Sequence, residues 1–206
     1  YPFYFFGEEI RVTRTNIQSI QAAIEAANRA KAEQWIIDVY KSYRANLVKA
    51  YAENRGRTGP VPACTQLGQV GPPLLENQPA KIVYTKPLIV LIDEFSVSAA
   101  DIFPSMMQDN VRAPLVGMRS SGGGGSVSSW PVGIYSESTT TTTNTLVVRK
   151  GPIASPEYPT ASYVENIGAI PDIELRYMTR ENLLNRGRPF VQAFTKILAD
   201  RIQAKR

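Results

Sequence analysis

The sequence predicts an α/β protein, and three observations lead to this prediction. The stretch 86–127 contains an apolar strand, a serine-bearing turn, a helical segment, and a second strand followed by four consecutive glycines. The segment 17–53 places apolar residues mostly at three- and four-residue steps, which is the spacing of a helix with one buried face. Further short apolar strands, such as Thr145 to Arg149 (TLVVR), follow the glycines.

Composition excludes several classes of protein. The 206 residues suit one domain with a sizeable core, and 43% hydrophobic with 20% charged residues is an ordinary globular balance. The net charge of +5 is mild and no long Lys/Arg run occurs, so we expect no nucleic-acid partner. No apolar stretch reaches the ~18–20 residues of a membrane-spanning helix.

Two residue counts limit the chemistry. The single cysteine, Cys64, cannot form an internal disulfide, and a cysteine-rich metal site is excluded. No histidine or flanking basic residue would activate this thiol, so we interpret it as incidental and expect neither metal nor cofactor. The chain contains no histidine at all, so a histidine-dependent site cannot be complete within it.

The first 80 residues divide into a helical part and a loop. Residues 1–10 are aromatic-rich and expected to be buried, and Asn16 is the expected helix cap. The polar stretch 29–34 is expected to split the helical lobe 16–55 into two helices. The lobe is expected to pack against a sheet or a neighbouring lobe; a coiled-coil partner helix is the less common alternative. Residues 56–80 hold five prolines and four glycines, which predicts a long loop.

The remaining elements follow in order. A short strand at 81–84 precedes the strand 88–92, the turn 95–98, a helix to about Asp109 and the strand 113–117. After the glycines we expect a strand at 127–135, an exposed hairpin at 136–145 that includes five consecutive threonines, and a strand at 145–149. Loops are expected at 151–160 and, with short extended pieces, at 163–175. Thr179 caps the next segment, and Pro189 opens a C-terminal amphipathic helix.

The serine turn has two interpretations. A serine at a helix N-terminus can act as a nucleophile, because the neighbouring amide, here Ala99 N–H, has no partner in the helix and can stabilise an oxyanion. Alternatively, Ser96 or Ser98 only caps the helix and Asp101 completes a capping box. The spacing alone favours the cap. The glycines are either a substrate cradle or a flexible loop, and they do not match a phosphate-binding motif.

Longer motifs favour the nucleophile. FSVSAADIF, Gln108-Asp109 and Leu115-Val116-Gly117 resemble the nucleophile region of the tail-specific protease superfamily, the carboxyl-terminal processing peptidases. This resemblance assigns the nucleophile to Ser98 rather than Ser96. Bacterial members of the superfamily use a Ser-Lys dyad, with the lysine in the loop after that glycine. Here the loop reads SSGGGG and contains no lysine.

The resemblance is closer to the branch typified by the chlamydial protease-like activity factor (CPAF), which uses serine, histidine and glutamate. YTKPLIVLIDEFS, Asp101, Pro104 and Asp109-Asn110 are similar to its nucleophile region. YVENIGAIPDIEL carries Glu165 at the position of the family's catalytic glutamate. The similarity covers roughly residues 81–177, the expected catalytic core, and 179–206 form the expected C-terminal helix.

The resemblance implies a crotonase/ClpP-like twisted sheet with flanking helices and a serine endopeptidase activity. Ser98 would be the nucleophile, and Glu165 would orient the histidine. The N–H of Ala99 would stabilise the oxyanion. The substrate would be bound by Gly122, Gly123 and Gly124. The histidine would come from an N-terminal fragment of the same precursor, which makes this chain a C-terminal subunit or fragment. Protein or peptide substrates are the other expected partners, with a homodimer as a further candidate, and the family's habits suggest a secreted or periplasmic protein.

The sequence leaves two alternatives open. One is a catalytically inactive relative that keeps the fold as a binding or assembly module. The other is a Ser-Lys hydrolase that recruits a lysine from elsewhere, such as Lys86 or Lys150.

Overall fold

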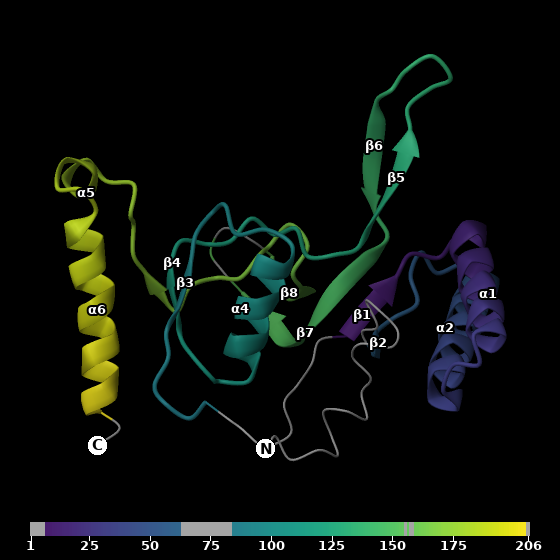
Figure 1. The fold of residues 1–206 in the computed structure, drawn as a ribbon, viewed down its shortest axis with the longest axis horizontal. Coiled ribbons are helices and arrows are strands. Elements are labelled where there is room, and N and C mark those ends of the chain that lie inside the picture. Colours follow the sequence, from purple (N-terminus) through teal and green to yellow (C-terminus); the bar gives the residue numbers. More distant parts are fainter. Residues whose placement is uncertain (1–6, 63–83, 155, 157–158, 205–206) are drawn as a thin grey trace. The chain divides into compact units, whose positions relative to one another are not determined.

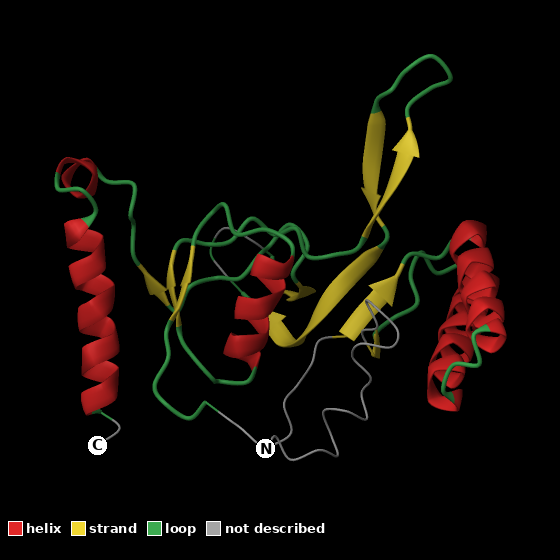
Figure 2. Cartoon of the chain, viewed as in Figure 1, coloured by secondary structure: helices red, strands yellow, loops and turns green. Residues whose placement is uncertain are grey.

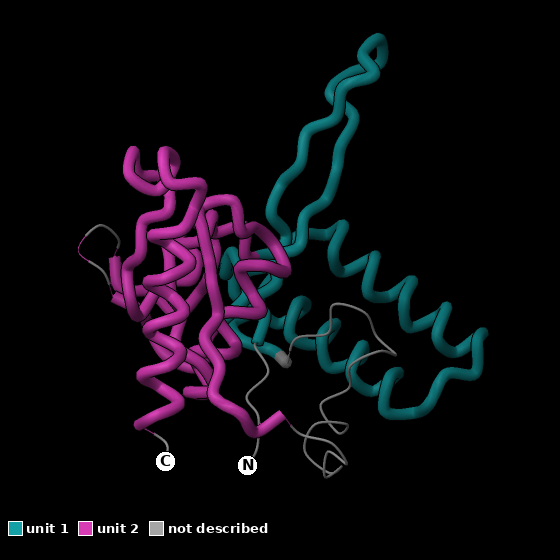
Figure 3. Tube along the Cα trace, turned by 60° about the vertical axis from the view of Figure 1, so that its left-hand side comes forward, with its two compact units in different colours: residues 1–78, 125–148 teal, residues 79–124, 149–206 magenta. Residues whose placement is uncertain are grey.

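The computed structural model describes residues 7–62, 84–154, 156 and 159–204. These residues form two compact units, which Figure 3 shows in different colours. The first unit comprises residues 1–78 and 125–148, and the second comprises 79–124 and 149–206. Both contain helices and strands (Figure 2), so the predicted α/β class is confirmed, with several small sheets in place of one large sheet.

The first unit combines a small antiparallel sheet with a helical hairpin (Figure 1). Strand β1 (Gly7–Ile10) pairs on one side with β2 (Val61–Pro62) and on the other with the first residues of β7 (Thr145–Ile153). Helices α1 (Arg14–Arg29) and α2 (Gln34–Ala52) lie side by side. Their apolar faces and the sheet enclose a core formed by Ile10, Tyr43, Leu47 and Val61.

The helical segment follows the sequence prediction except at its start. It divides after Arg29 and resumes at Gln34, which confirms the predicted split. The expected cap at Asn16 is wrong, because α1 begins at Arg14 and its cap is Thr13. The Thr13 side chain accepts a hydrogen bond from Asn16 N–H at 3.0 Å. Asn16 therefore lies in the first turn of the helix instead of ahead of it.

The threonine-rich segment supplies one strand of a hairpin, instead of forming a hairpin of its own within 136–145 as predicted; its partner is the strand predicted from Val127. Strands β5 (Val127–Pro131) and β6 (Thr139–Thr143) pair antiparallel, from Val127 opposite Thr143 to Pro131 opposite Thr139. The first strand ends at Pro131 instead of the expected Tyr135, because the chain turns just beyond it, where Val132 N–H donates to the Ser138 carbonyl at 3.0 Å.

The second unit contains a three-stranded parallel sheet of order β3-β4-β9. Strand β3 (Val90–Ile92), helix α4 (Ala99–Asp109) and β4 (Leu115–Gly117) form a β-α-β unit, and β9 (Ile173–Glu174) pairs with β4. Ile92, Leu115 and Ala169 form its core. Both expected strands of the β-α-β unit are present, although each is shorter than the apolar run that predicts it.

Strand β7 is longer than its sequence pattern indicates. It continues past the expected end at Arg149 to Ile153, so the loop expected from Gly151 begins later. In the four-stranded sheet β7 lies between β1 and β8 (Ala161–Tyr163), and β8 is a tertiary partner that the local pattern does not reveal.

The C-terminal part of the second unit is helical. Thr179 caps α5 (Arg180–Leu184) as expected, and α6 (Arg188–Gln203) has Pro189 in its first turn. The ring of Phe190 makes edge contacts with Tyr177 and Phe194. Residues 81–83 of the expected strand and Cys64 lie outside the described residues, as does the loop 56–80 beyond β2.

Candidate active site

The serine turn and the glycine run follow two neighbouring parallel strands. The turn 93–98 comes directly after β3, and the segment 118–125 comes directly after β4. Because the carboxyl ends of parallel strands lie at one edge of a sheet, both segments emerge at the same edge, where α/β proteins commonly bind ligands.

Ser96 holds the turn in shape. Its Oγ donates to Asp93 Oδ1 at 2.9 Å and accepts from Asp93 N–H at 3.3 Å. The same carboxylate oxygen accepts from Phe95 N–H at 3.1 Å, and the Ser96 carbonyl accepts from Ser121 N–H at 2.8 Å. The Ser96 hydroxyl is therefore used inside the turn.

Ser98 has an unusual backbone conformation. It is exposed and precedes α4 with φ 62° and ψ −118°, the geometry of the first central residue of a type II′ turn, where glycine is preferred. The ordinary caps of this chain, Thr13 and Thr179, have φ −139° and −111°. A non-glycine residue in such a region costs about 1–3 kcal/mol, and strain of this kind is concentrated at functional sites.

The capping interpretation is also realised in the structure. Asp101 completes a capping box with Ser98, and its Oδ2 accepts from Ser98 N–H at 2.9 Å. A cap does not require positive φ, however, since caps typically have extended backbone. Capping therefore explains the Asp101 contact but leaves the conformation of Ser98 unexplained.

The amide of Ala99 is available at the start of the helix. Ala99 is the first residue of α4, and among the described residues no acceptor takes its N–H. Ala99 and Ala100 are both exposed and small. The amide that the sequence assigns to an oxyanion is thus positioned beside Ser98 at the positive end of the helix.

The glycine run packs closely between the serine turn and the Glu165 turn. A Cβ on Gly123 would lie 2.8 Å from Val97 Cγ2, and one on Gly124 would lie 2.4 Å from Val164 Cβ. A real Cβ essentially never lies this close to another heavy atom, so larger residues would displace one of these neighbours. The glycines are therefore needed for close packing, whatever part they have in substrate binding.

Glu165 lies in a tight turn that contacts the glycine run. Asn166, with φ 62°, donates its N–H to the Gly122 carbonyl at 2.8 Å, and Gly168 N–H donates to the Val164 carbonyl at 2.7 Å. Glu165 itself is half-buried. The structure thus brings all of the predicted site residues into three adjoining segments, while their catalytic roles remain predictions.

The two candidate lysines lie near the other end of α4. Lys150 N–H donates to Asp109 Oδ2 at 3.1 Å, and the Lys86 carbonyl accepts from Arg112 Nη2 at 3.1 Å. Asp109 ends the helix that Ser98 precedes, and eleven residues of helix span roughly 16 Å. This placement disfavours a Ser-Lys pair with either lysine.

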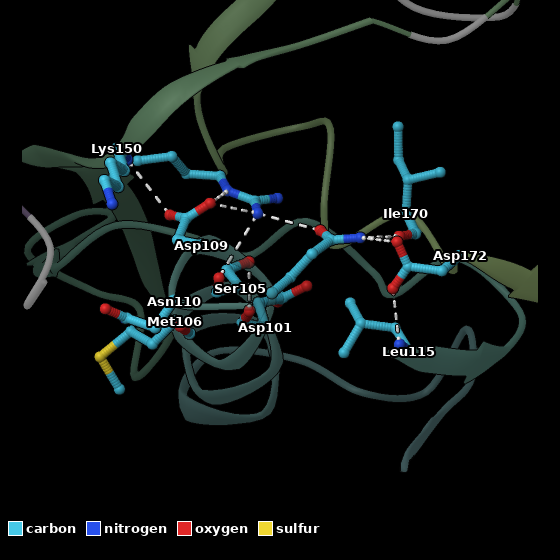
Figure 4. Close-up of polar contacts among 11 residues, drawn as sticks. Asp101, Ser105, Met106, Asp109, Asn110, Leu115, Lys150, Ile170 and Asp172 are labelled. Atoms are coloured by element: carbon cyan, nitrogen blue, oxygen red, sulfur yellow. Dashed lines mark hydrogen bonds and ion pairs between the residues drawn. The ribbon is translucent and has the colours of Figure 1, made fainter. Parts of the chain in front are cut away.

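A buried polar network fixes the far end of α4 (Figure 4). Arg149 is only 4% exposed, and its guanidinium donates to Asp109 Oδ1 at 2.6 Å and to Gln108 Oε1 at 2.9 Å. Gln108 in turn donates to Asp172 Oδ1 at 2.9 Å. Sequence reasoning missed this network; its only local signal is an arginine at the inward-facing end of the strand TLVVR.

Tyr177 links the C-terminal segment to the serine turn. Its hydroxyl donates to Oε1 of Glu94 at 3.1 Å, and Glu94 is a residue of that turn. Removal from water raises the pKa of the Tyr177 phenol, and the hydrogen bond and charge of Glu94, with a contribution from Asp93, raise it further. The phenol therefore stays protonated at higher pH than an ordinary tyrosine.

Neither a membrane span nor a metal cluster occurs among the described residues. They contain no helix that is both long enough and apolar enough to cross a membrane. In the same part of the chain, no three His, Cys, Asp or Glu side chains gather where they could hold a metal ion.

Comparison with known proteins identifies relatives. The model of peptidase family S41 matches residues 9–175. A Chlamydia pneumoniae protein is 35% identical over 119 residues, which is 56% of this chain and 17% of that protein. A Chlamydia trachomatis protein is 28% identical over 171 residues, which is 81% of this chain and 26% of that protein.

Solved structures show the same fold. Mature CPAF complexed with lactacystin superposes with a TM-score of 0.72 at 21% identity, covering 98% of this chain and 39% of that one. Mature CPAF alone gives a TM-score of 0.69 at 21% identity, covering 97% and 38%. The chain thus spans about a quarter or less of these curated relatives and about two fifths of the matched structures.

Proposed function

The chain belongs to peptidase family S41, and we propose that it carries the nucleophile and the acid of a Ser-His-Glu endopeptidase site. The observation that carries the proposal is the strained, exposed Ser98 beside the Ala99 amide, which no acceptor takes among the described residues. The histidine would belong to a segment of the full-length protein outside these 206 residues, which contain none.

The proposed reaction is acyl transfer to Ser98. The histidine removes the hydroxyl proton as Oγ attacks the peptide carbonyl carbon, and Ala99 N–H donates to the resulting oxyanion. The protonated histidine then gives its proton to the leaving amine as the C–N bond breaks. Water, activated by the same histidine, hydrolyses the acyl-enzyme and restores the Ser98 hydroxyl.

Glu165 would orient the histidine and stabilise its protonated form, as the acid of a catalytic triad does. Its support is the contact of its turn with the glycine run, which itself contacts the serine turn. In this arrangement Gly122, Gly123 and Gly124 would line the path of the substrate backbone.

The test is covalent labelling of the full-length protein with a fluorophosphonate probe, whose phosphorus is attacked by an activated serine with loss of fluoride. We expect labelling of the unmodified protein and its loss in Ser98→Ala. Ser129→Ala is the control, because Ser129 is an exposed serine on β5 outside the three site segments and its loss should leave labelling unchanged. Labelling that survives in Ser98→Ala would assign another serine, and an unreactive full-length protein would favour the inactive binding module.

A further inference from the structure

The carboxylate of Asp101 accepts four hydrogen bonds in the interior of the second unit. Asp101 is fully buried, at 0% exposure. Its Oδ1 accepts from Ser120 Oγ at 2.5 Å and Gly122 N–H at 2.8 Å. Its Oδ2 accepts from Ser98 N–H and from Gly123 N–H, both at 2.9 Å. One side chain therefore joins the serine turn to the glycine run.

The connection continues to the Glu165 turn through Ser120. This residue is also fully buried, and its Oγ accepts from Ala169 N–H at 2.7 Å while donating to Asp101. Its backbone N–H donates to the Ala169 carbonyl at 3.1 Å. Asp101 thus holds, directly or through one residue, all three segments that carry the predicted site residues.

A helix cap alone does not account for this arrangement. A capping-box carboxylate reaches one amide, that of the N-cap residue, and is satisfied by it. Here three more donors come from residues 19 to 22 positions along the chain. Burying an ionised carboxylate is costly unless hydrogen bonds compensate it, and four donors use the full acceptor capacity of both oxygens.

We propose that Asp101 is a positioning residue for the hydrolysis assigned to Ser98. It holds Ser98 in its strained conformation and fixes the spacing between Ser98 and the turn that bears Glu165. The proposal rests on the proposed function, and Asp101 acts through Ser98 and the glycine run without touching the substrate.

Substitution by asparagine has a defined structural consequence. An amide keeps one oxygen and replaces the other with an NH₂ group that cannot accept. If the NH₂ group takes the place of Oδ1, the Ser120 hydroxyl can rotate to accept from it, but Gly122 N–H loses its acceptor. If the NH₂ group takes the place of Oδ2, both Ser98 N–H and Gly123 N–H lose their acceptor. In either orientation a backbone segment of the site must move.

Asp109→Asn is the matched control. Asp109 lies on the same helix, and its carboxylate is likewise hydrogen-bonded, to Arg149 and to Lys150 N–H. It contacts none of the three site segments, so its loss should reduce stability and leave the chemistry unchanged. Comparing the two variants separates positioning of Ser98 from general stabilisation of α4.

The experiment measures the rate constant of fluorophosphonate inactivation (kinact) and the probe's apparent affinity (KI) in the full-length protein. For Asp101→Asn we expect kinact to fall about 100-fold, since a misplacement near 1 Å costs about that much, and KI to change less than about threefold. For Asp109→Asn we expect kinact to stay within about threefold of the unmodified protein. Thermal unfolding of both variants confirms that they are folded at the assay temperature.

The outcomes are distinct. If folded Asp101→Asn keeps the kinact of the unmodified protein, or if kinact falls equally in both variants, the positioning role is overturned and the proposed function remains intact. An unreactive unmodified protein overturns the proposed function and this inference with it. If Asp101→Asn does not fold, Ser120→Ala takes its place: about a tenfold lower kinact supports the inference, and an unchanged kinact overturns it.

Discussion

Replacing Ser98 with glycine should make the protein more stable while abolishing the activity proposed for it. Ser98 has φ 62° and ψ −118°, a conformation that glycine adopts without strain. Relief of the strain should contribute about 1–3 kcal/mol. Against this, glycine adds about 0.4–1 kcal/mol of unfolded-state entropy, and loss of the cap side chain costs a few tenths. The net stabilisation is about 1 kcal/mol.

The assay is thermal or urea unfolding of the unmodified protein and Ser98→Gly. For a domain of about 150–250 residues, 1 kcal/mol corresponds to an increase in Tm of about 2–4 °C. Thr179→Gly is the control, because Thr179 caps α5 in an extended conformation with φ −111° and its replacement should destabilise. If Ser98→Gly lowers the Tm as Thr179→Gly does, Ser98 is an unstrained cap and the argument from backbone strain fails.

Three other predictions follow from the described contacts. Gly124→Ala should abolish labelling of the full-length protein by displacing the Glu165 turn, whereas Gly133→Ala, which meets nothing within 4 Å, should not. Asp109→Asn should lower the free energy of unfolding by about 3–5 kcal/mol, measured by urea titration, because it leaves a buried guanidinium without its carboxylate. In an absorbance titration, Tyr177→Phe should remove a phenol that ionises above the usual range. Because folding raises the pKa of Tyr177, the contribution of this phenol to stability is present below the ordinary tyrosine pKa. That contribution is lost as the pH rises through the pKa of Tyr177 in the folded protein.

Much of the second unit could be predicted because its signals are local. The apolar runs before and after α4, the small residues at its start and the glycines after β4 each specify their element from neighbouring residues. The cap of α1 could not be located to the residue, because Thr13 and Asn16 are both good caps and lie three positions apart. The extension of β7 depends on β8, a partner that lies beyond a loop.

The polar interior was beyond the reach of local patterns. From the sequence, Asp101 is interpreted as one half of a capping box. Only the structure shows that it also accepts hydrogen bonds from Ser120, Gly122 and Gly123. From the sequence, Arg149 is only the polar end of a strand, because its carboxylate partner, Asp109, lies 40 residues away along the chain. Backbone strain at Ser98 is equally invisible in the sequence, because serine is a common residue at ordinary caps.

The glycine run and the carboxylate of Asp101 explain each other. Two successive amides can approach one buried carboxylate only if the intervening backbone lies close to the serine turn. At Gly123 a Cβ would be 2.8 Å from Val97 Cγ2 and 3.7 Å from Asp101 Oδ2, so a side chain there would push the amide away from its acceptor. The run is therefore an ordered part of the site, selected for close approach, and the interpretation of these glycines as a flexible loop does not account for their packing. These contacts hold Ser98 in place without a histidine, which is compatible with the proposal that the base belongs to another segment.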